Sequence, residues 1–274
     1  MEYKITQRGA ELYAPVEFDL LNTFECGQCF RWMKADDGAY TSIVKGRFVR
    51  VYREGDTVII DGTDEETFET LWREYFDIDT DYEALRQEMV GLCPDLQKAA
   101  GKLNGIRILR QEPWEALCSF IISQNNNIPR IQGIVSRLCE NFGDDTGMGY
   151  SFPCAERIAA LEAEDLAVLR AGFRARYIID AARKCSDGRV DLERLRDAPI
   201  DEARRELMTI TGVGNKVADC TMLYGLHKME AFPIDVWMKK ALSSEFSGVT
   251  PDSLGRTAGI AQQYIFHYTR NNEE

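Results

Sequence analysis

The stretch Leu207-Met-Thr-Ile-Thr-Gly-Val-Gly-Asn-Lys-Val-Ala-Asp219 decides how this chain of 274 residues is interpreted. It predicts a helix that ends near Thr209, a tight turn at Gly212-Val213-Gly214 and a new helix that begins at Asn215. Glycines permit positive φ and the close approach of a phosphate. The free N–H groups and the dipole of the new helix then favour that anion. We therefore predict a helix–hairpin–helix grip on a nucleic-acid backbone at about 201–227, although plain helix–helix packing explains a bare Gly-x-Gly turn equally well.

Lys216 is the residue of this stretch that can do chemistry. Most single lysines are simply solvated, but this one falls in the first turn of the predicted helix, where the dipole disfavours a cation. That position favours the neutral amine, which is the form that attacks a sugar carbon and forms a Schiff base. Asp235, in Phe232-Pro-Ile-Asp-Val-Trp-Met238, is predicted to cap a helix. If Asp235 lies near Lys216, its carboxylate can stabilise a cationic sugar transition state.

The rest of the chain predicts an α+β fold. Short β-rich runs with turn residues between them indicate an antiparallel sheet, at 30–34, 40–45, 47–53 and 57–61. An amphipathic helix is expected over 61–81, and further helices at 113–124, 128–142, 155–161, 164–171, 174–187, 200–209, 214–227, 235–246 and 251–269. We predict a sheet domain with flanking helices at 1–100 and a helical bundle that holds the catalytic cleft at 101–274.

The net charge of −12 is unusual for a protein that binds nucleic acid. The charge is unevenly spread, because the first 100 residues carry 21 acidic and 11 basic side chains. Basic residues gather in two later segments, 102–137 and 170–189. Since charges more than a Debye length apart are screened, a local basic patch can still bind phosphate.

Eight cysteines sit mostly among apolar residues, which is typical of reduced thiols in a reducing cytosol. The lone pair Cys26-Gly-Gln-Cys29 lacks the second pair of a zinc site and the context of a redox site, so we interpret it as coincidence. No metal and no cofactor is expected. Because no apolar run or signal pattern stands out, we expect no membrane association and a cytoplasmic protein, nucleoid-associated if prokaryotic. We also expect the protein to be monomeric.

Thr211 to Asp219, with Pro233-Ile-Asp-Val236, resembles the hairpin and aspartate of the helix–hairpin–helix DNA glycosylases. Three further segments are similar to those of the 8-oxoguanine DNA glycosylases: Cys26-Gly-Gln-Cys-Phe-Arg-Trp32, Ser119-Phe-Ile-Ile-Ser-Gln-Asn-Asn-Asn-Ile-Pro-Arg-Ile131 and Gly172-Phe-Arg-Ala-Arg-Tyr177. The resemblance covers nearly the whole chain. It implies a TBP-like N-terminal sheet followed by an all-helical glycosylase domain. It also implies an enzyme that flips 8-oxoguanine out of duplex DNA and excises it, preferably opposite cytosine, then nicks the strand by β-elimination.

The resemblance assigns the chemistry to Lys216, as the nucleophile and Schiff-base lysine, and to Asp235 as its partner. Gly212, Val213 and Gly214 would hold a DNA phosphate. Gly27 would offer its carbonyl to N7–H of the lesion. Such a contact selects the lesion, because oxidation at C8 turns N7 from an acceptor into a donor.

Four further residues are placed in the lesion pocket by the same resemblance. Cys220 and Phe266 would sandwich the base, and Gln262 would bond its Watson–Crick edge. Tyr224 replaces a smaller apolar residue of the family, which changes the shape of the pocket. Without the family, Cys220 and Phe266 would be interpreted as core residues and Gln262 as a surface glutamine.

The gap left by the base would be filled by Asn125, Arg130 and Arg174, which hold the orphaned cytosine, and by Phe173 as a wedge in the opposite strand. The alternative for these residues is a loop cluster, two surface charges and a buried aromatic. Trp237 stands where animal-type members carry histidine, which leaves the phosphate contact there and the strictness for cytosine open.

Two alternative functions remain at this stage. One is a helix–hairpin–helix glycosylase for another damaged base; endonuclease III-like and adenine-removing members usually carry an iron–sulfur cluster, and this chain lacks the tight cluster of four cysteines that would hold one. The other is a non-catalytic DNA-binding protein, which needs neither Lys216 nor Asp235. Borohydride trapping on damaged duplex DNA distinguishes the enzyme from the binding protein.

Overall fold

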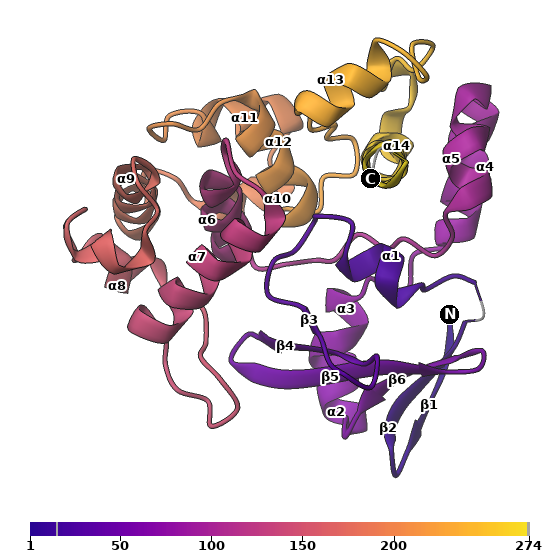
Figure 1. The fold of residues 1–274 in the computed structure, drawn as a ribbon, viewed down its shortest axis with the longest axis horizontal. Coiled ribbons are helices and arrows are strands. Elements are labelled where there is room, and N and C mark those ends of the chain that lie inside the picture. The colour runs from indigo at the N-terminus through magenta and orange to yellow at the C-terminus, as the bar shows by residue number, and fades with distance from the viewer. Residues whose placement is uncertain (15, 273–274) are drawn as a thin grey trace.

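The computed structural model describes residues 1–14 and 16–272 and has an antiparallel sheet followed by helices, which confirms the α+β prediction. Six strands lie in the order β1-β2-β6-β5-β4-β3. Their bounds are β1 (Glu2–Thr6), β2 (Gly9–Tyr13), β3 (Met33–Lys34), β4 (Tyr40–Val44), β5 (Arg47–Glu54) and β6 (Thr57–Asp61). Figure 1 shows the sheet at the lower right, with most helices above it and to its left.

The predicted strands at 40–45, 47–53 and 57–61 are confirmed, whereas the predicted strand at 30–34 is wrong over most of its length. Only Met33 and Lys34 pair, as the edge strand β3, because the chain turns through Gly27 at a φ of +82° just before it. Phe30 then enters the core of the helices and Trp32 enters the core of the sheet. The hairpin β1–β2 was not among the predicted strands.

The predicted helix over 61–81 runs from α2 (Glu65–Thr67) through a π-helical turn, η1 (Phe68–Trp72), to α3 (Arg73–Tyr75). The remaining elements before the hairpin are α1 (Leu20–Phe24), α4 (Tyr82–Leu92), η2 (Pro94–Leu96), α5 (Gln97–Lys102), α6 (Pro113–Ser123), α7 (Ile128–Phe142), α8 (Ala155–Ala159), η3 (Asp165–Leu169), α9 (Arg174–Ser186) and α10 (Leu192–Asp197). Then follow α11 (Ile200–Leu207), α12 (Asn215–Tyr224), α13 (Val236–Leu242), η4 (Pro251–Ser253), η5 (Gly255–Thr257) and α14 (Ala258–Asn271).

The structure corrects three of the helix predictions. The segment predicted as a helix at 164–171 is the short 3-10 helix η3, which ends because Arg170 takes a left-handed φ of 56°. The helix predicted at 235–246 ends at Leu242, and the helix predicted at 251–269 is two 3-10 turns followed by α14. The helices α1, α4, α5 and α10 were not predicted.

The buried apolar residues form two hydrophobic cores. One lies between the sheet and the helices α1 to α3, and the other joins α4 to α14. The second core also takes in Cys26 and Phe30 from the N-terminal part of the chain. Residues 82–102 pack in this second core. The domain boundary at residue 100 stays a prediction. None of the helices in the described part of the chain is long and apolar enough to cross a membrane.

Candidate active site

The hairpin between α11 and α12 has the conformation that its glycines predict. Gly212 has a φ of +79°, and a Cβ there would lie 2.3 Å from the ring of Tyr177, so a side chain cannot fit. Gly214 is the N-cap of α12 and has open space around it. At the start of the hairpin, the amide of Thr211 donates to Asp180 on α9 at 2.7 Å. The backbone N–H groups of residues 214–216 have no acceptor among the described residues, so they are available to an anion.

Lys216 lies in the first turn of α12 and is half-buried. Its Nζ donates a hydrogen bond of 2.9 Å to Oγ of Ser123, at the end of α6. The same Nζ lies 5.1 Å from the centre of the Phe120 ring. The Ser123 hydroxyl in turn donates to the Phe120 carbonyl at 2.8 Å. The amine is therefore held in one place by a polar and an aromatic contact from α6.

Asp235 is the N-cap of α13, as predicted, and one carboxylate oxygen accepts from the amide of Met238 at 2.9 Å. The charges of Asp235 and Lys216 both act on the thiol of Cys220. Burial raises the pKa of Cys220 to about 11, while the charge of Lys216 lowers this pKa and the charge of Asp235 raises it. The amine on α12 and the carboxylate at the start of α13 thus both lie close enough to this thiol for their charges to change its pKa.

Gly27 lies against the side chain of Phe266. A Cβ on Gly27 would be 3.1 Å from Cε1 of Phe266 and 3.7 Å from a guanidinium nitrogen of Arg270. Phe266 is half-buried on α14, and Arg270 lies one turn later, 5.9 Å from the centre of its ring. The structure therefore brings together two of the residues predicted to contact the lesion, one from the N-terminal part and one from the last helix.

Gln262 and Tyr224 are both buried, at 4% exposure each, so Gln262 is no surface glutamine. The hydroxyl of Tyr224 donates to Oε1 of Gln263 at 2.6 Å and lies 3.2 Å from Oε1 of Gln262. Burial raises the pKa of Tyr224 well above its usual range, so the hydroxyl acts as a donor. Tyr224 therefore fixes the side chains at the bottom of the predicted lesion pocket.

The four residues predicted to fill the gap lie together. Arg174 stacks on Phe173, with 4.5 Å from the guanidinium to the ring centre, and donates to the Asn125 carbonyl at 3.0 Å. Burial and then the charge of Arg130 lower the pKa of Arg174. Phe173 is 42% exposed, so it is no buried aromatic.

Arg174 differs from the prediction in one respect. It is only 3% exposed, and its guanidinium donates to the carbonyls of Gln124, Asn125 and Ala171. In this arrangement Arg174 supports the loop that carries Asn125, whose φ is +46°, and its contact with cytosine stays a prediction. Arg130 is exposed at the start of α7, and its guanidinium has no partner among the described residues.

The basic patch is smaller than the two basic segments suggest. Arg107 is 1% exposed and donates to backbone carbonyls, so it cannot bind phosphate. Several other bases are taken up by acids or carbonyls, namely Arg110, Arg137, Arg183, Lys184 and Arg189. Arg130, Arg170 and Arg176 stay exposed and have no partner in the described part of the chain. These three remain as candidates for phosphate contacts.

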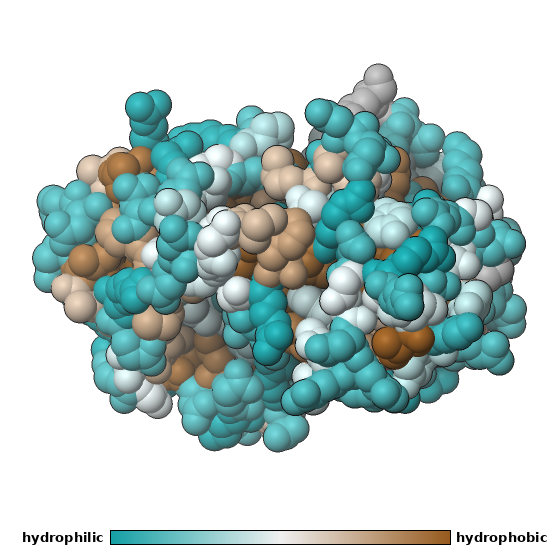
Figure 2. Space-filling model, turned by 90° about the horizontal axis from the view of Figure 1, so that it is seen from below, coloured by the Kyte–Doolittle hydropathy of each residue, from teal (hydrophilic) through white to brown (hydrophobic). Residues whose placement is uncertain are grey.

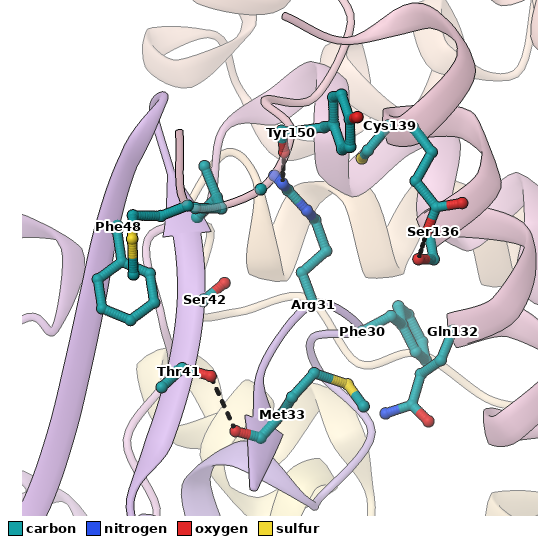
Figure 3. Close-up of a pocket in the computed structure, with 14 residues that line it drawn as sticks. Phe30, Arg31, Met33, Thr41, Ser42, Phe48, Gln132, Ser136, Cys139 and Tyr150 are labelled. Atoms are coloured by element: carbon teal, nitrogen blue, oxygen red, sulfur yellow. Dashed lines mark hydrogen bonds between the residues drawn. The ribbon is translucent and has the colours of Figure 1, made fainter. Parts of the chain in front are cut away.

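A separate pocket of about 270 Å³ lies between β4 and α7, and Arg31 crosses it (Figure 3). It opens among exposed apolar side chains such as Met33, Phe48 and Tyr150. None of the predicted site residues lines it. The face seen in Figure 2 is mostly hydrophilic, with hydrophobic residues at the surface near its middle. We therefore place the chemistry at Lys216 and not in this pocket.

Cys26 and Cys29 are free and buried, and burial raises the pKa of Cys26 to about 12. A thiol with so high a pKa is not a reactive thiolate. Among the residues that the structure describes, no group of histidine, cysteine and acidic side chains could hold a metal ion.

Comparison with known proteins identifies the family. Residues 12–117 match the model "8-oxoguanine DNA glycosylase, N-terminal domain", and residues 118–253 match "HhH-GPD superfamily base excision DNA repair protein". An N-glycosylase/DNA lyase of Saccharomyces cerevisiae is 34% identical over 84% of this chain and 69% of its own length. The chain belongs to the 8-oxoguanine DNA glycosylase family. This member is therefore a base excision repair enzyme with DNA N-glycosylase and AP lyase activity, and the non-catalytic alternative is set aside.

Solved structures of the family have the same fold over the whole chain. A structure of MBOgg1 with a low-affinity DNA ligand is 40% identical, with a TM-score of 0.93 and 100% coverage of both chains. The Clostridium acetobutylicum 8-oxoguanine glycosylase/lyase, solved with double-stranded DNA containing cytosine opposite 8-oxoG, is 35% identical, with a TM-score of 0.92 over 100% of this chain and 99% of that one.

Two residues of the site were not predicted for this glycosylase: Ser123, which accepts from Lys216, and Gln263, which lies beside Gln262. Ser123 stands inside the quoted segment 119–131, two residues before Asn125, so a signal was present. Gln263 had none, since a glutamine on an apolar helix face does not reveal what it contacts. Its Nε2 donates to the Cys26 carbonyl at 2.8 Å, across 237 residues of sequence.

Proposed function

We propose that this enzyme excises 8-oxoguanine from duplex DNA, preferably opposite cytosine, with Lys216 as the nucleophile. The observation that carries the proposal is the placement of the Lys216 amine. It is held at 2.9 Å by Ser123, with the charge of Asp235 acting at the adjacent thiol of Cys220. An amine at the start of a helix with a carboxylate nearby is suited to attack on an electron-poor sugar carbon.

The excision step follows from these groups. The lone pair of Lys216 Nζ forms a bond to C1′ of the everted nucleotide while the glycosidic bond breaks, and the bonding pair leaves with the base. The amine loses one proton after the new bond forms, and the departing base takes up one proton, so the charges balance. Asp235 stabilises the positive charge that develops on the sugar as the base leaves.

The strand is then cut by elimination. Expulsion of the ring oxygen, which takes up a proton, leaves a Schiff base between Nζ and C1′. Removal of a C2′ proton drives cleavage of the bond between C3′ and its phosphate, and water finally releases Lys216. Borohydride reduces the Schiff base, so the covalent intermediate can be captured.

Recognition of the lesion is assigned to the Gly27 carbonyl. No hydrogen bond from another described residue reaches this carbonyl, so it is available to an N–H donor. In 8-oxoguanine N7 carries a hydrogen, whereas in guanine N7 would face the carbonyl as a second acceptor. A buried acceptor that faces another acceptor costs about 1–3 kcal/mol, which supports selection of the oxidised base.

The preference for cytosine is supported by the cluster of Asn125, Arg130, Phe173 and Arg174. Cytosine offers acceptors that the free guanidinium of Arg130 can satisfy. The Clostridium relative was solved with cytosine opposite 8-oxoG, which agrees with this assignment. Duplex DNA is the proposed partner of a monomeric enzyme, and because phosphate contacts release counterions, binding should weaken steeply with salt.

Borohydride trapping on a duplex with 8-oxoguanine opposite cytosine tests the proposal. The wild-type protein should give a covalent adduct and a nicked strand, and Lys216→Gln should give neither while still binding the duplex. Lys4→Gln, at an exposed lysine on β1, is the matched control and should react as wild type does. Turnover by Lys216→Gln would reject the nucleophile. A panel of other damaged bases then tests the alternative, since a protein that prefers another lesion rejects the assigned substrate.

A further inference from the structure

The carbonyls on both sides of Gly27 are each held by a buried glutamine. Nε2 of Gln263, on α14, donates to the carbonyl of Cys26 at 2.8 Å. Nε2 of Gln111 donates to the carbonyl of Gln28 at 2.7 Å. Gln263 is fully buried and Gln111 is 5% exposed. Of these three successive carbonyls, only that of Gly27 is left without a donor from the described residues.

Tyr224 connects the two glutamines to each other. Its hydroxyl donates to Oε1 of Gln263 at 2.6 Å, and its backbone carbonyl accepts from the amide of Gln111 at 3.0 Å. The ring of Tyr224 stacks on Phe120 with 5.2 Å between ring centres. Tyr224 is also the last residue of α12, the helix that carries Lys216 in its first turn. The bonds form a closed circuit that runs from α12 through α14 to residues 26–28 and returns through Gln111.

We propose that Gln263, Gln111 and Tyr224 are positioning residues that orient the Gly27 carbonyl toward the lesion and hold it at a fixed place relative to the helix of Lys216. This inference rests on the proposed function of Gly27 and deepens it. Gly27 has a φ of +82°, a conformation in which the adjoining peptide planes can turn because no Cβ opposes them. A free glycine at this place could present either its N–H or its carbonyl to the base. The bound Cys26 carbonyl belongs to the peptide plane before Gly27, and the bound Gln28 carbonyl belongs to the plane after Gln28, so the two bonds hold the backbone on both sides of the plane that carries the Gly27 carbonyl.

The burial of the circuit makes it rigid. Hydrogen bonds in a low dielectric are strengthened, and a broken one leaves a polar group unpaired away from water. Tyr224 connects the lesion pocket to the circuit, because its hydroxyl contacts both Gln262 and Gln263. The one hydroxyl therefore donates to the side chain that holds the Cys26 carbonyl and contacts the side chain assigned to the Watson–Crick edge. An apolar side chain at 224 would leave both glutamines to rotate independently.

The inference is tested by comparing two reactions of each variant under single-turnover conditions. The first is excision of 8-oxoguanine opposite cytosine, which requires the Gly27 carbonyl. The second is cleavage of the same duplex with a preformed abasic site, which requires Lys216 and the fold but has no base to recognise. Gln263→Leu and Tyr224→Phe should slow excision by about tenfold or more, as expected from one lost buried hydrogen bond, and change abasic cleavage by less than about twofold. Tyr75→Phe is the matched control, because it removes a buried hydroxyl outside the circuit that accepts from Trp32 at 2.9 Å.

Gln263→Glu supplies a conservative variant for the case in which Gln263→Leu fails to fold. A protonated carboxyl has the shape of the amide, donates to the Cys26 carbonyl and accepts from Tyr224, so excision should be close to wild type at low pH. Burial raises the pKa of such a carboxyl. Once it ionises at higher pH, it repels the Cys26 carbonyl, and the ratio of excision to abasic cleavage should fall. The wild-type ratio should not show this additional fall.

The outcomes separate the inference from the proposed function. If excision and abasic cleavage fall together in the variants, or if neither changes, the circuit does not orient the Gly27 carbonyl and the inference is wrong. If the wild-type protein cuts abasic DNA but leaves 8-oxoguanine in place, the proposed substrate is wrong and the inference fails with it. A selective loss of excision supports both.

Discussion

Replacing Gly212 with alanine should destabilise the protein, whereas the same replacement at Gly214 should not. At Gly212 the φ of +79° places an alanine in the left-handed region, which costs about 1–2 kcal/mol. Its Cβ would lie 2.3 Å from Cδ2 of Tyr177, so the ring must move, and overpacking of this kind costs about 1–3 kcal/mol. The free energy of unfolding of Gly212→Ala should therefore fall by about 2–5 kcal/mol.

Urea unfolding measures this effect, and the midpoint of Gly212→Ala should fall by about 1 M, given the steep denaturant dependence of a chain of this size. Gly214 has a φ of −103° with no atom within 4 Å of a built Cβ, so Gly214→Ala should unfold at the wild-type midpoint. If a phosphate approaches the hairpin closely, this control variant should nevertheless bind duplex DNA about tenfold more weakly. A wild-type midpoint for Gly212→Ala would refute the described turn and its contact with Tyr177.

Two other predictions follow from single residues. Burial lowers the pKa of His267 from 6.5 to about 4, so below pH 6.5 the unfolded chain binds a proton that the folded protein refuses. The free energy of unfolding is therefore unaffected by His267 above pH 6.5 and should fall by about 3 kcal/mol as the pH drops to about 4. Urea midpoints at several pH values measure this fall. If the midpoint of His267→Gln falls as steeply with pH as that of the wild type, the prediction is wrong. Arg130→Ala removes the exposed guanidinium of the gap cluster, so excision opposite the other bases should rise relative to excision opposite cytosine. An unchanged ranking of opposite bases in single-turnover assays would reject that role.

The sequence predicts those elements whose ends are marked by local chemistry. The helix at 128–142 is confirmed at both ends, because the side chain of Asn127 caps it by accepting from the amide of Arg130 and Pro129 fits its first turn. The same holds for Asp235 at the start of α13. The strand pair β1–β2 has no such mark at its turn. Its place depends on Gly9, where a Cβ would lie 2.1 Å from the Ile60 carbonyl of β6, and such a long-range approach is not visible in a local pattern.

The same limit applies to the site. Lys216, Asp235 and the hairpin glycines could be predicted because each follows from a helix start, a cap or a turn within a few residues. Ser123 contacts Lys216 across 93 residues, and Gln111 contacts Gln28 across 83. Neither contact leaves a periodic or spacing signal. Buried polar side chains of this kind are explained only when their partners are known, so the positioning part of the site required the structure.

These long-range polar contacts explain how two separate parts of the chain can act on one nucleotide. In the proposed function, Gly27 recognises the lesion from the N-terminal part of the chain, and Lys216 attacks the sugar from α12. Gln28 joins the two parts: its fully buried side chain donates to the carbonyls of Thr23 and Arg107 at 2.8 and 2.7 Å and accepts from the amide of Leu109 at 2.9 Å.

Hydrophobic contacts alone would let these parts slide, because they have no preferred direction. Hydrogen bonds do have one, and a buried amide that loses its partners is costly. A displacement of about 1 Å between reacting groups can cost about 100-fold in rate. On the proposed mechanism, the buried glutamines around Gly27 therefore stabilise one particular register between the Gly27 carbonyl and Lys216, and that register is then a condition for catalysis as well as for folding.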